Sequence, residues 1–118
     1  MDEKPITIDE LVEVGDALSG KNVLAKGIIS GFSTYNSADG SSGIDVYVRS
    51  RRDGPYVHVT GDLENSLPST LAKSVALLKA LEKDGKVIEI KGVYTHSNSD
   101  PRIKADYLKY NNFLISFR

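Results

Sequence analysis

Aromatic and cationic side chains recur at every second position in two short runs of the sequence. Tyr47 and Arg49 lie in the first run, and Tyr56 and His58 lie in the second. In an extended chain, residues two positions apart face the same side. The rings offer flat faces for stacking, and a guanidinium group binds anions. The chemistry that these residues indicate is therefore recognition of a ligand.

The sequence predicts no catalytic site. His58 and His96 are its only histidines, and it has no cysteine. It contains no His-Glu-x-x-His pair, no phosphate-binding glycine loop and no Gly-x-Ser-x-Gly elbow. The acids near Asp39 lack the spacing of a calcium loop. We therefore expect a protein that is not an enzyme, without a metal or other cofactor, in which His58 is a stacking or surface residue.

Length, composition and charge favour one globular domain over residues 1–118. No apolar run approaches the roughly 20 residues of a membrane span, and the N-terminus lacks a signal segment, so we expect a cytoplasmic protein without membrane contact. Residues 1–18 hold six acids against Lys4, a net charge of −5, which leaves +4 on residues 19–118. One hypothesis is that this acidic N-terminal segment (1–19) folds back toward the cations of the body.

Two runs with the same glycine spacing, 20–29 and 85–94, predict strands that are kinked at their second glycine. We expect a bulge or sharp bend there, as in a strand that serves two sheets of a small barrel. The inward positions of the first strand are Val23, Ala25, Gly27 and Ile29. Lys26 faces outward.

The two aromatic runs predict a hairpin. Residues 44–49 and 56–60 alternate between apolar and polar side chains, and Asp53-Gly54 is a strong turn signal between them. Their inward residues are Ile44, Val46, Val48, Val57 and Val59. Their outward residues are Asp45, Tyr47, Arg49, Tyr56 and His58, with Arg51 and Arg52 at the tip.

The other elements follow from capping and periodicity. Thr7 and Glu10 have the spacing of a capping box, which predicts a short N-terminal helical turn. Residues 30–43 are rich in glycine and serine and predict a mobile loop, in which Phe32 and Tyr35 either anchor the loop or contact a ligand.

A helix is predicted over 68–84, with a buried stripe of leucine and valine and Gly85 at its end. Its stripe is Leu67, Leu71, Val75, Leu78 and Leu81. A second glycine-kinked strand (86–96), a loop (97–101) and a last strand (102–107) follow.

This order of elements, with a closing strand of the form Ile103-x-Ala105-x-x-Leu108, resembles the OB-fold, the oligonucleotide/oligosaccharide-binding barrel. The resemblance covers residues 20–110 and implies a five-stranded all-β barrel with one helix inserted between its third and fourth strands. Among OB-folds the sequence is similar to nucleic-acid-binding branches, namely single-stranded-DNA-binding domains of the replication protein A type and anticodon-binding-like domains.

The resemblance implies a site on the outer face of the second and third strands. On that face it implies binding of single-stranded DNA or RNA, with bases stacked on rings and phosphates on cations. The expected site residues are Tyr47, Arg49, Tyr56, His58, Arg51, Arg52, Phe32, Tyr35, Lys26, Arg102 and Lys104, with Asn98 beside them. The chain departs from the family pattern because it has no tryptophan and a calculated pI of 6.1.

Two alternatives stay open at this point. Large side chains on exposed hairpins also form cross-strand packing pairs that stabilise a sheet without binding a ligand. OB barrels also dock partner proteins, and the apolar C-terminal tail (111–118), which includes Phe113 and Phe117, either covers the barrel or binds such a partner.

Overall fold

The computed structural model of the chain describes residues 4–36, 38, 40–65, 67–96 and 100–118. Five strands close into a barrel, because β2 pairs with β3 on one edge and with β5 on the other. Around the barrel the strands are β2 (Asn22–Asn36), β3 (Ser42–Arg49), β4 (Tyr56–Asp62), β6 (Arg102–Tyr110) and β5 (Val87–Thr95). The pairing of β4 with β6 is parallel, and the other barrel pairings are antiparallel. The predicted all-β barrel with one inserted helix is confirmed.

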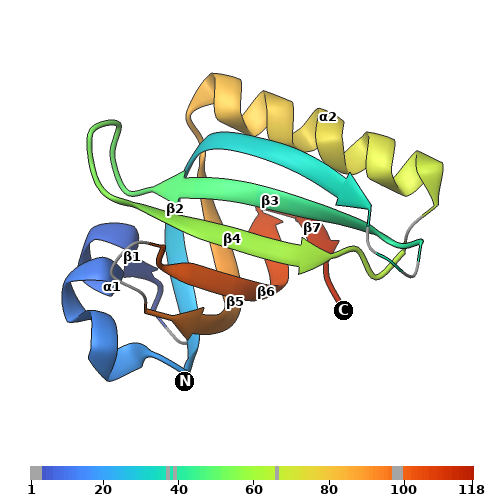
Figure 1. Cartoon of the computed structure of the whole chain (residues 1–118). Coiled ribbons are helices and arrows are strands. Elements are labelled where there is room, and N and C mark those ends of the chain that lie inside the picture. The colour runs from blue at the N-terminus through green and yellow to red at the C-terminus, as the bar shows by residue number, and fades with distance from the viewer. Residues whose placement is uncertain (1–3, 37, 39, 66, 97–99) are drawn as a thin grey trace.

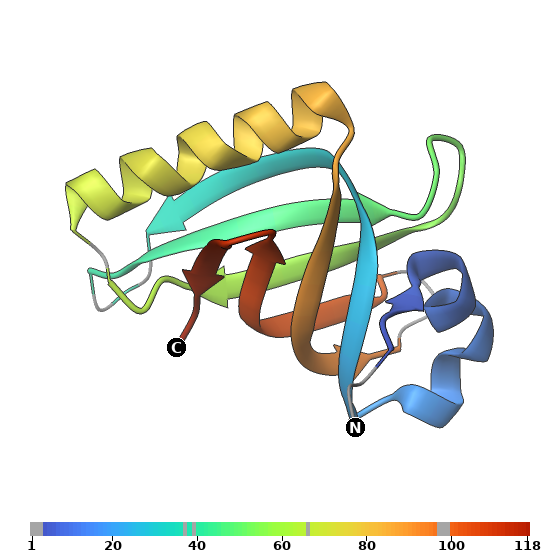
Figure 2. The same ribbon diagram turned by 180° about the vertical axis from the view of Figure 1, so that it is seen from behind.

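Two short strands extend this sheet. β1 (Ile6–Thr7) pairs parallel with β2, and β7 (Phe113–Ser116) pairs antiparallel with β6. Neither strand was predicted, since two and four residues are too few to show a period. Figures 1 and 2 show α2 (Pro68–Asp84) along one side of the barrel, and α1 (Ile8–Val14) with the short 3-10 helix η1 (Gly15–Leu18) on the other.

The two glycine-kinked strands differ in where they are irregular. In β5 the register shifts between Lys91 and Gly92, as predicted, and a Cβ on Gly92 would collide with the backbone of β6. In β2 the shift lies between Ile29 and Gly31, so the bulge is not at Gly27. Gly27 is needed for a different reason: a Cβ there would lie 2.6 Å from the backbone oxygen of Arg49.

The predicted loop at residues 30–43 is mostly strand. β2 continues to Asn36, and β3 begins at Ser42. Phe32 pairs with Val46 on the inner face and packs against the core, which supplies the apolar contact that holds this segment extended. Tyr35 lies opposite Gly43. Glycine and serine composition misled the prediction because small residues also occupy strand positions, both exposed ones such as Ser33 and buried ones such as Ser42.

Helix α2 has the predicted bounds. Gly85 ends it in the left-handed conformation with φ of 61°, which glycine adopts at little cost. Its buried residues are Ser74, Leu78 and Leu81. Leu71 and Leu77 are partly buried and pack against the core. Leu67 is 60% exposed, so its predicted place in the buried stripe is wrong. Leu67 is the N-cap residue and precedes the packed turns of the helix.

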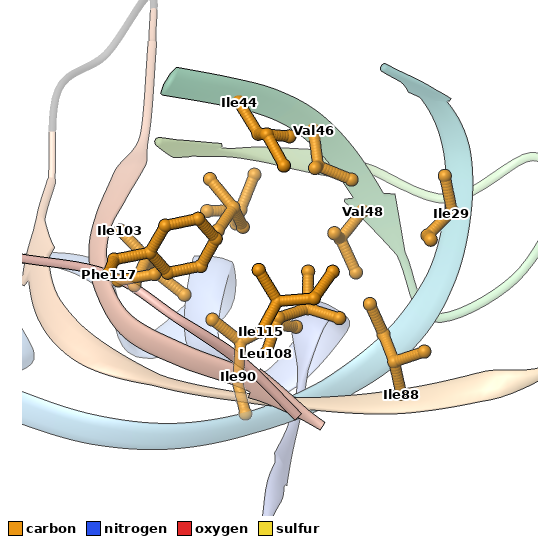
Figure 3. Packing of buried hydrophobic residues seen from close by; sticks show 14 of the residues in the cluster. Ile29, Ile44, Val46, Val48, Ile88, Ile90, Ile103, Leu108, Ile115 and Phe117 are labelled. Atoms are coloured by element: carbon orange, nitrogen blue, oxygen red, sulfur yellow. The ribbon is translucent and has the colours of Figure 1, made fainter. Parts of the chain in front are cut away.

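The core fills the barrel with branched aliphatic side chains from all five barrel strands (Figure 3). Ile8 and Leu11 of α1 are fully buried and close one end. The predicted helical start is confirmed, because Thr7 is the N-cap residue and its Oγ1 accepts from the Glu10 N–H at 3.2 Å; the Glu10 carboxylate accepts from the Thr7 hydroxyl at 2.9 Å. In the C-terminal tail Ile115 and Phe117 are buried, so this part of the tail covers the barrel. No helix in the described part of the chain is both long enough and apolar enough to cross a membrane.

Candidate functional site

Strand register places six of the expected residues on one outer surface of the barrel. Tyr47 lies directly opposite His58, and Arg49 lies opposite Tyr56. The parallel pairing of β4 with β6 sets Arg102 beside His58 and Lys104 beside Thr60. We call this surface the β3–β4–β6 face; its members are Tyr47, Arg49, Tyr56, His58, Arg102 and Lys104. The predicted hairpin and its alternation are confirmed, with Val46, Val48, Val57 and Val59 buried beneath.

The aromatic rings of this face contact one another. Tyr47 stacks on His58 with centroids 4.9 Å apart and planes 14° apart, and Tyr56 meets Tyr47 edge-on at 5.3 Å. Such pairs stabilise a sheet, as the packing alternative expects. Tyr47 and Tyr56 nevertheless remain 40% and 37% exposed. The rings are therefore a rigid and still accessible platform.

Arg49 is fixed at the hairpin end of the face. Its guanidinium carbon lies 5.5 Å from the centre of the Tyr56 ring. Nη1 donates to the Gly54 carbonyl at 3.1 Å, and Nε donates to Ser30 Oγ at 3.3 Å. These contacts hold a cation beside the platform and leave other guanidinium N–H groups to meet a ligand.

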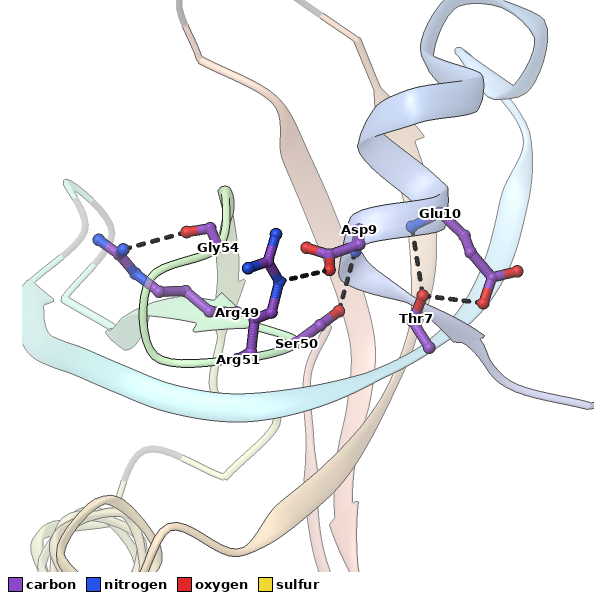
Figure 4. A network of polar contacts seen from close by, with 7 residues as sticks. All are labelled: Thr7, Asp9, Glu10, Arg49, Ser50, Arg51 and Gly54. Carbon is purple, nitrogen blue, oxygen red and sulfur yellow. Dashed lines mark hydrogen bonds and ion pairs between the residues drawn. The ribbon is translucent and has the colours of Figure 1, made fainter.

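The two arginines of the hairpin tip have different surroundings. Arg51 forms an ion pair with Asp9 of α1, with Nε 3.0 Å from Oδ2, and the Asp9 N–H donates to Ser50 Oγ at 2.8 Å (Figure 4). Arg52 is exposed and lines a cavity of about 550 Å³ next to the C-terminal turn of α2. One acid of the N-terminal segment thus contacts an expected site cation.

Two carboxylates flank His58. Asp45 Oδ1 lies 3.4 Å from His58 Nε2, and Asp100 Oδ1 lies 3.9 Å from Nδ1. Asp100 Oδ2 also accepts from Arg102 Nε at 2.6 Å. These acids offset part of the positive charge of the face. Sequence reasoning placed Asp45 outward on the predicted hairpin but did not assign it to the site. It did not assign Asp100 either, because the pairing of β4 with β6 that brings Asp100 to His58 is not visible in the sequence.

Tyr35 lies at the far end of the same sheet surface. Its ring covers Gly43, and its hydroxyl donates to Asp62 Oδ1 at 2.7 Å. Burial raises the pKa of Tyr35 above its ordinary value, and the hydrogen bond to Asp62 and the charges of Asp62 and Asp45 add to this rise. Tyr35 is therefore a structural anchor in this conformation.

The structure does not bring the remaining expected residues to the β3–β4–β6 face. Phe32 faces the core, and Lys26 lines a separate cavity with Glu89 and Lys109. Asn98 lies outside the described residues. Among the described residues no cluster of histidine, aspartate and glutamate could hold a metal ion.

The structure has a second surface that could bind a partner, and the sequence indicated only its C-terminal tail. Two adjoining cavities of about 770 and 520 Å³ lie between α2 and β7, and both are lined by Thr70, Ser74, Leu114 and Ile115. Phe113 and Leu114 are 58% and 57% exposed. We call this region the α2–β7 groove.

Comparison with known proteins supports the fold. A solved structure described as "OBody AM1L10 bound to hen egg-white lysozyme" matches with a TM-score of 0.62 and 22% sequence identity, over 96% of this chain and 97% of that chain. No protein-family model matches the sequence, and no curated protein matches it. The barrel is OB-like in its fold.

Proposed function

We propose that this protein binds single-stranded nucleic acid on the β3–β4–β6 face. The observation that carries the proposal is the exposed tyrosine pair: Tyr47 and Tyr56 present 40% and 37% of their surface next to Arg49. Stacking of a base on an aromatic ring is worth about 1–3 kcal/mol and tolerates any base, because every base has a flat face. The protein is then a binding module and needs no catalytic group.

Charge sets the expected strength of this binding. Arg49, Arg102 and Lys104 supply cations along the face, but Asp100 already pairs with Arg102 and Asp45 lies beside His58. We expect the protein to neutralise about two phosphates of a bound single strand. Each such contact contributes roughly −0.7 to the slope of the logarithm of the binding constant against the logarithm of the salt concentration, so the expected slope is roughly −1.4. The expected binder is therefore moderate in affinity and gains most from stacking.

A titration of labelled single-stranded DNA and RNA at low and moderate salt tests the proposal. Tyr47→Ala and Tyr56→Ala should each weaken binding by about 5-fold or more, the low end of the stacking range. Lys104→Ala should weaken it less and reduce the salt slope. Lys26→Ala is the matched control, because it removes an exposed lysine from a different surface. Equal affinity of wild type and both tyrosine variants would refute the proposal.

A protein partner is the second candidate, and the α2–β7 groove is the observation that favours it. Along the described chain β7 pairs with β6 on one edge, and its other edge meets residues 63–64 at its C-terminal end only. An extended peptide with apolar side chains would pair with the open part of β7 and fill the groove beside Phe113 and Leu114. The solved OB-like neighbour is itself described as bound to a protein.

Substitution of an exposed residue of the α2–β7 groove distinguishes the two candidate functions, nucleic-acid binding and protein binding. Leu114→Ser should leave strand binding unchanged, since Leu114 lies outside the β3–β4–β6 face. If wild type binds no strand at low salt while a library of extended peptides yields a ligand that Leu114→Ser abolishes, protein binding is the function.

A further inference from the structure

β7 leaves part of one edge open along the described chain. In an antiparallel pair, successive residues point their backbone N–H and C=O groups to opposite edges. The Phe117 N–H donates to the Asp106 carbonyl on the β6 side at 2.9 Å. The Ser116 carbonyl accepts from the Glu64 N–H on the other side at 3.1 Å. By this alternation the N–H and C=O of Leu114 point away from β6, at the open part of the edge.

The side chains at this open edge are apolar. Phe113 and Leu114 are both more than half exposed, and β7 contains neither a charged residue nor a proline. Charged residues and prolines are two of the means by which edge strands avoid pairing with another chain. Four residues form few backbone hydrogen bonds, so a partner strand at this edge would gain most of its binding energy from apolar contacts in the α2–β7 groove.

The α2–β7 groove carries opposite charges at its two ends. Glu64 lines the end beside Ser116, and Lys73 lines the end beside Phe113. Both charged residues are exposed. A second copy of the chain, related to the first by a two-fold axis at Leu114, runs along the groove in the opposite direction. This symmetry brings Glu64 of each copy to the Lys73 end of the other, so the groove is complementary to itself in charge.

We propose that the α2–β7 groove is the contact surface of a symmetric dimer of this chain; the inference names the protein partner that the second candidate function leaves open, and it does not depend on strand binding. The two copies of β7 pair antiparallel, and the N–H and C=O of Leu114 bond to Leu114 of the other copy. In this register Phe113 lies opposite Ile115 of the other copy. Side chains of such a pair lie close together, so each Phe113 ring enters the groove that Ile115 lines in the other copy.

The dimer leaves the β3–β4–β6 face accessible. None of the six residues that define this face lines either cavity of the groove. Each barrel of the dimer therefore keeps its own face for a ligand. Dimer formation and strand binding can be measured separately.

Sedimentation equilibrium of wild type over roughly 5–500 µM tests the dimer, since small interfaces give dissociation constants in the micromolar range. The apparent mass should rise from 12.9 kDa toward twice that value. Leu114→Ser and Phe113→Ser should each weaken association by about 10-fold or more, because every dimer then loses two apolar side chains from its interface. Val87→Ser is the matched control, because Val87 is 56% exposed on β5, outside the groove. Thermal unfolding of each variant checks the fold.

A charge exchange between two variants tests the antiparallel arrangement. Glu64→Lys places a cation at both ends of the groove, and Lys73→Glu places an acid at both ends. Each variant alone then sets like charges against each other and should associate roughly 5- to 10-fold more weakly than wild type. An equimolar mixture of the two variants sets opposite charges together at both contacts and should recover association. Lys79→Glu reverses an exposed charge of α2 outside the groove and should associate as wild type does.

Three results would each overturn the dimer: a wild type that stays monomeric over the whole range, Leu114→Ser and Phe113→Ser variants that associate as wild type does, or a mixture that recovers no association. A monomeric wild type that takes an extended peptide in the groove would leave the second candidate function standing without the dimer. A titration with a short labelled strand, at protein concentrations below the dimer range, separates this inference from nucleic-acid binding. If monomeric wild type binds the strand, only the dimer fails; if a dimer forms and binds no strand, only the nucleic-acid proposal fails.

Discussion

Asp9 and Arg51 join the N-terminal helix to the tip of the β3–β4 hairpin, with Oδ2 accepting from Nε at 3.0 Å. The contact spans 42 positions in the sequence. It ties an acid of the N-terminal segment to a cation at the hairpin end of the proposed binding face. The Arg51 side chain is 68% exposed, so the pair is screened by solvent and can exchange with a phosphate.

Removal of this competing charge should strengthen strand binding. Asp9→Asn frees Arg51, and an exposed ion pair is worth about 0.2–1 kcal/mol, so affinity at low salt should rise by up to about fivefold. Glu13→Gln is the matched control, because it removes one acid from the same helix at an exposed position. If both variants raise affinity equally, net charge is the cause; if neither does, the contact has no part in binding.

How far the sequence predicted the fold depended on the range of the interactions involved. Helix α2 and the hairpin were predicted closely because capping, turns and periodicity are local. The pairing of β4 with β6 brings Arg102 beside His58 through an interaction between distant segments, and no local pattern reports it. The position of Asp100 against His58 therefore could not be predicted.

The misplaced residues have a similar cause. Phe32 was assigned to a loop because glycine and serine surround it, yet its register with Val46 turns it inward. Lys26 was correctly placed outward, but a barrel has outward positions all around, and periodicity alone cannot say which strand lies next to it. Closure with β5 sets Lys26 opposite Glu89, away from the β3–β4–β6 face.

Ionisation of Tyr35 should destabilise the protein at high pH. The pKa of Tyr35 is raised in the folded state, mainly by burial and then by Asp62, so its contribution to stability is full below the unfolded pKa of about 10 and is lost as the pH rises toward the higher folded value. Urea unfolding at pH 8 and pH 11 should show a larger loss for wild type than for Tyr35→Phe.

At pH 8 the same Tyr35→Phe variant should cost about 0.5–1.5 kcal/mol, the net value of one hydrogen bond. Tyr56→Phe removes a hydroxyl from an exposed ring and serves as the control. A wild type whose stability falls no more steeply with pH than that of Tyr35→Phe would contradict the assigned role of this phenol.

Gly43 should tolerate no side chain. The ring of Tyr35 lies directly over it, so the Cβ of Gly43→Ala would overlap that ring. Overpacking of this kind typically costs about 1–3 kcal/mol. Gly31→Ala is the comparison, because its Cβ meets nothing closer than 3.9 Å and should change the free energy of unfolding by less. Equal losses in the two variants would mean that Tyr35 moves aside freely.

The two phenylalanines of the C-terminal tail should differ in their effect on stability. Phe117 is 8% exposed, and its ring packs on Gly61, whereas Phe113 is 58% exposed beside the α2–β7 groove. Phe117→Ala should cost about 3–5 kcal/mol by opening a cavity in the barrel wall. Phe113→Ala should stay within about 1 kcal/mol, because its ring is mostly in water already.

Chemical denaturation measures both losses, and strand binding by the folded Phe113→Ala variant should match wild type. The two rings are four positions apart in one tail, so a difference between them reports their packing and not their place in the sequence. A large loss for Phe113→Ala together with a small one for Phe117→Ala would contradict this packing of the tail on the barrel.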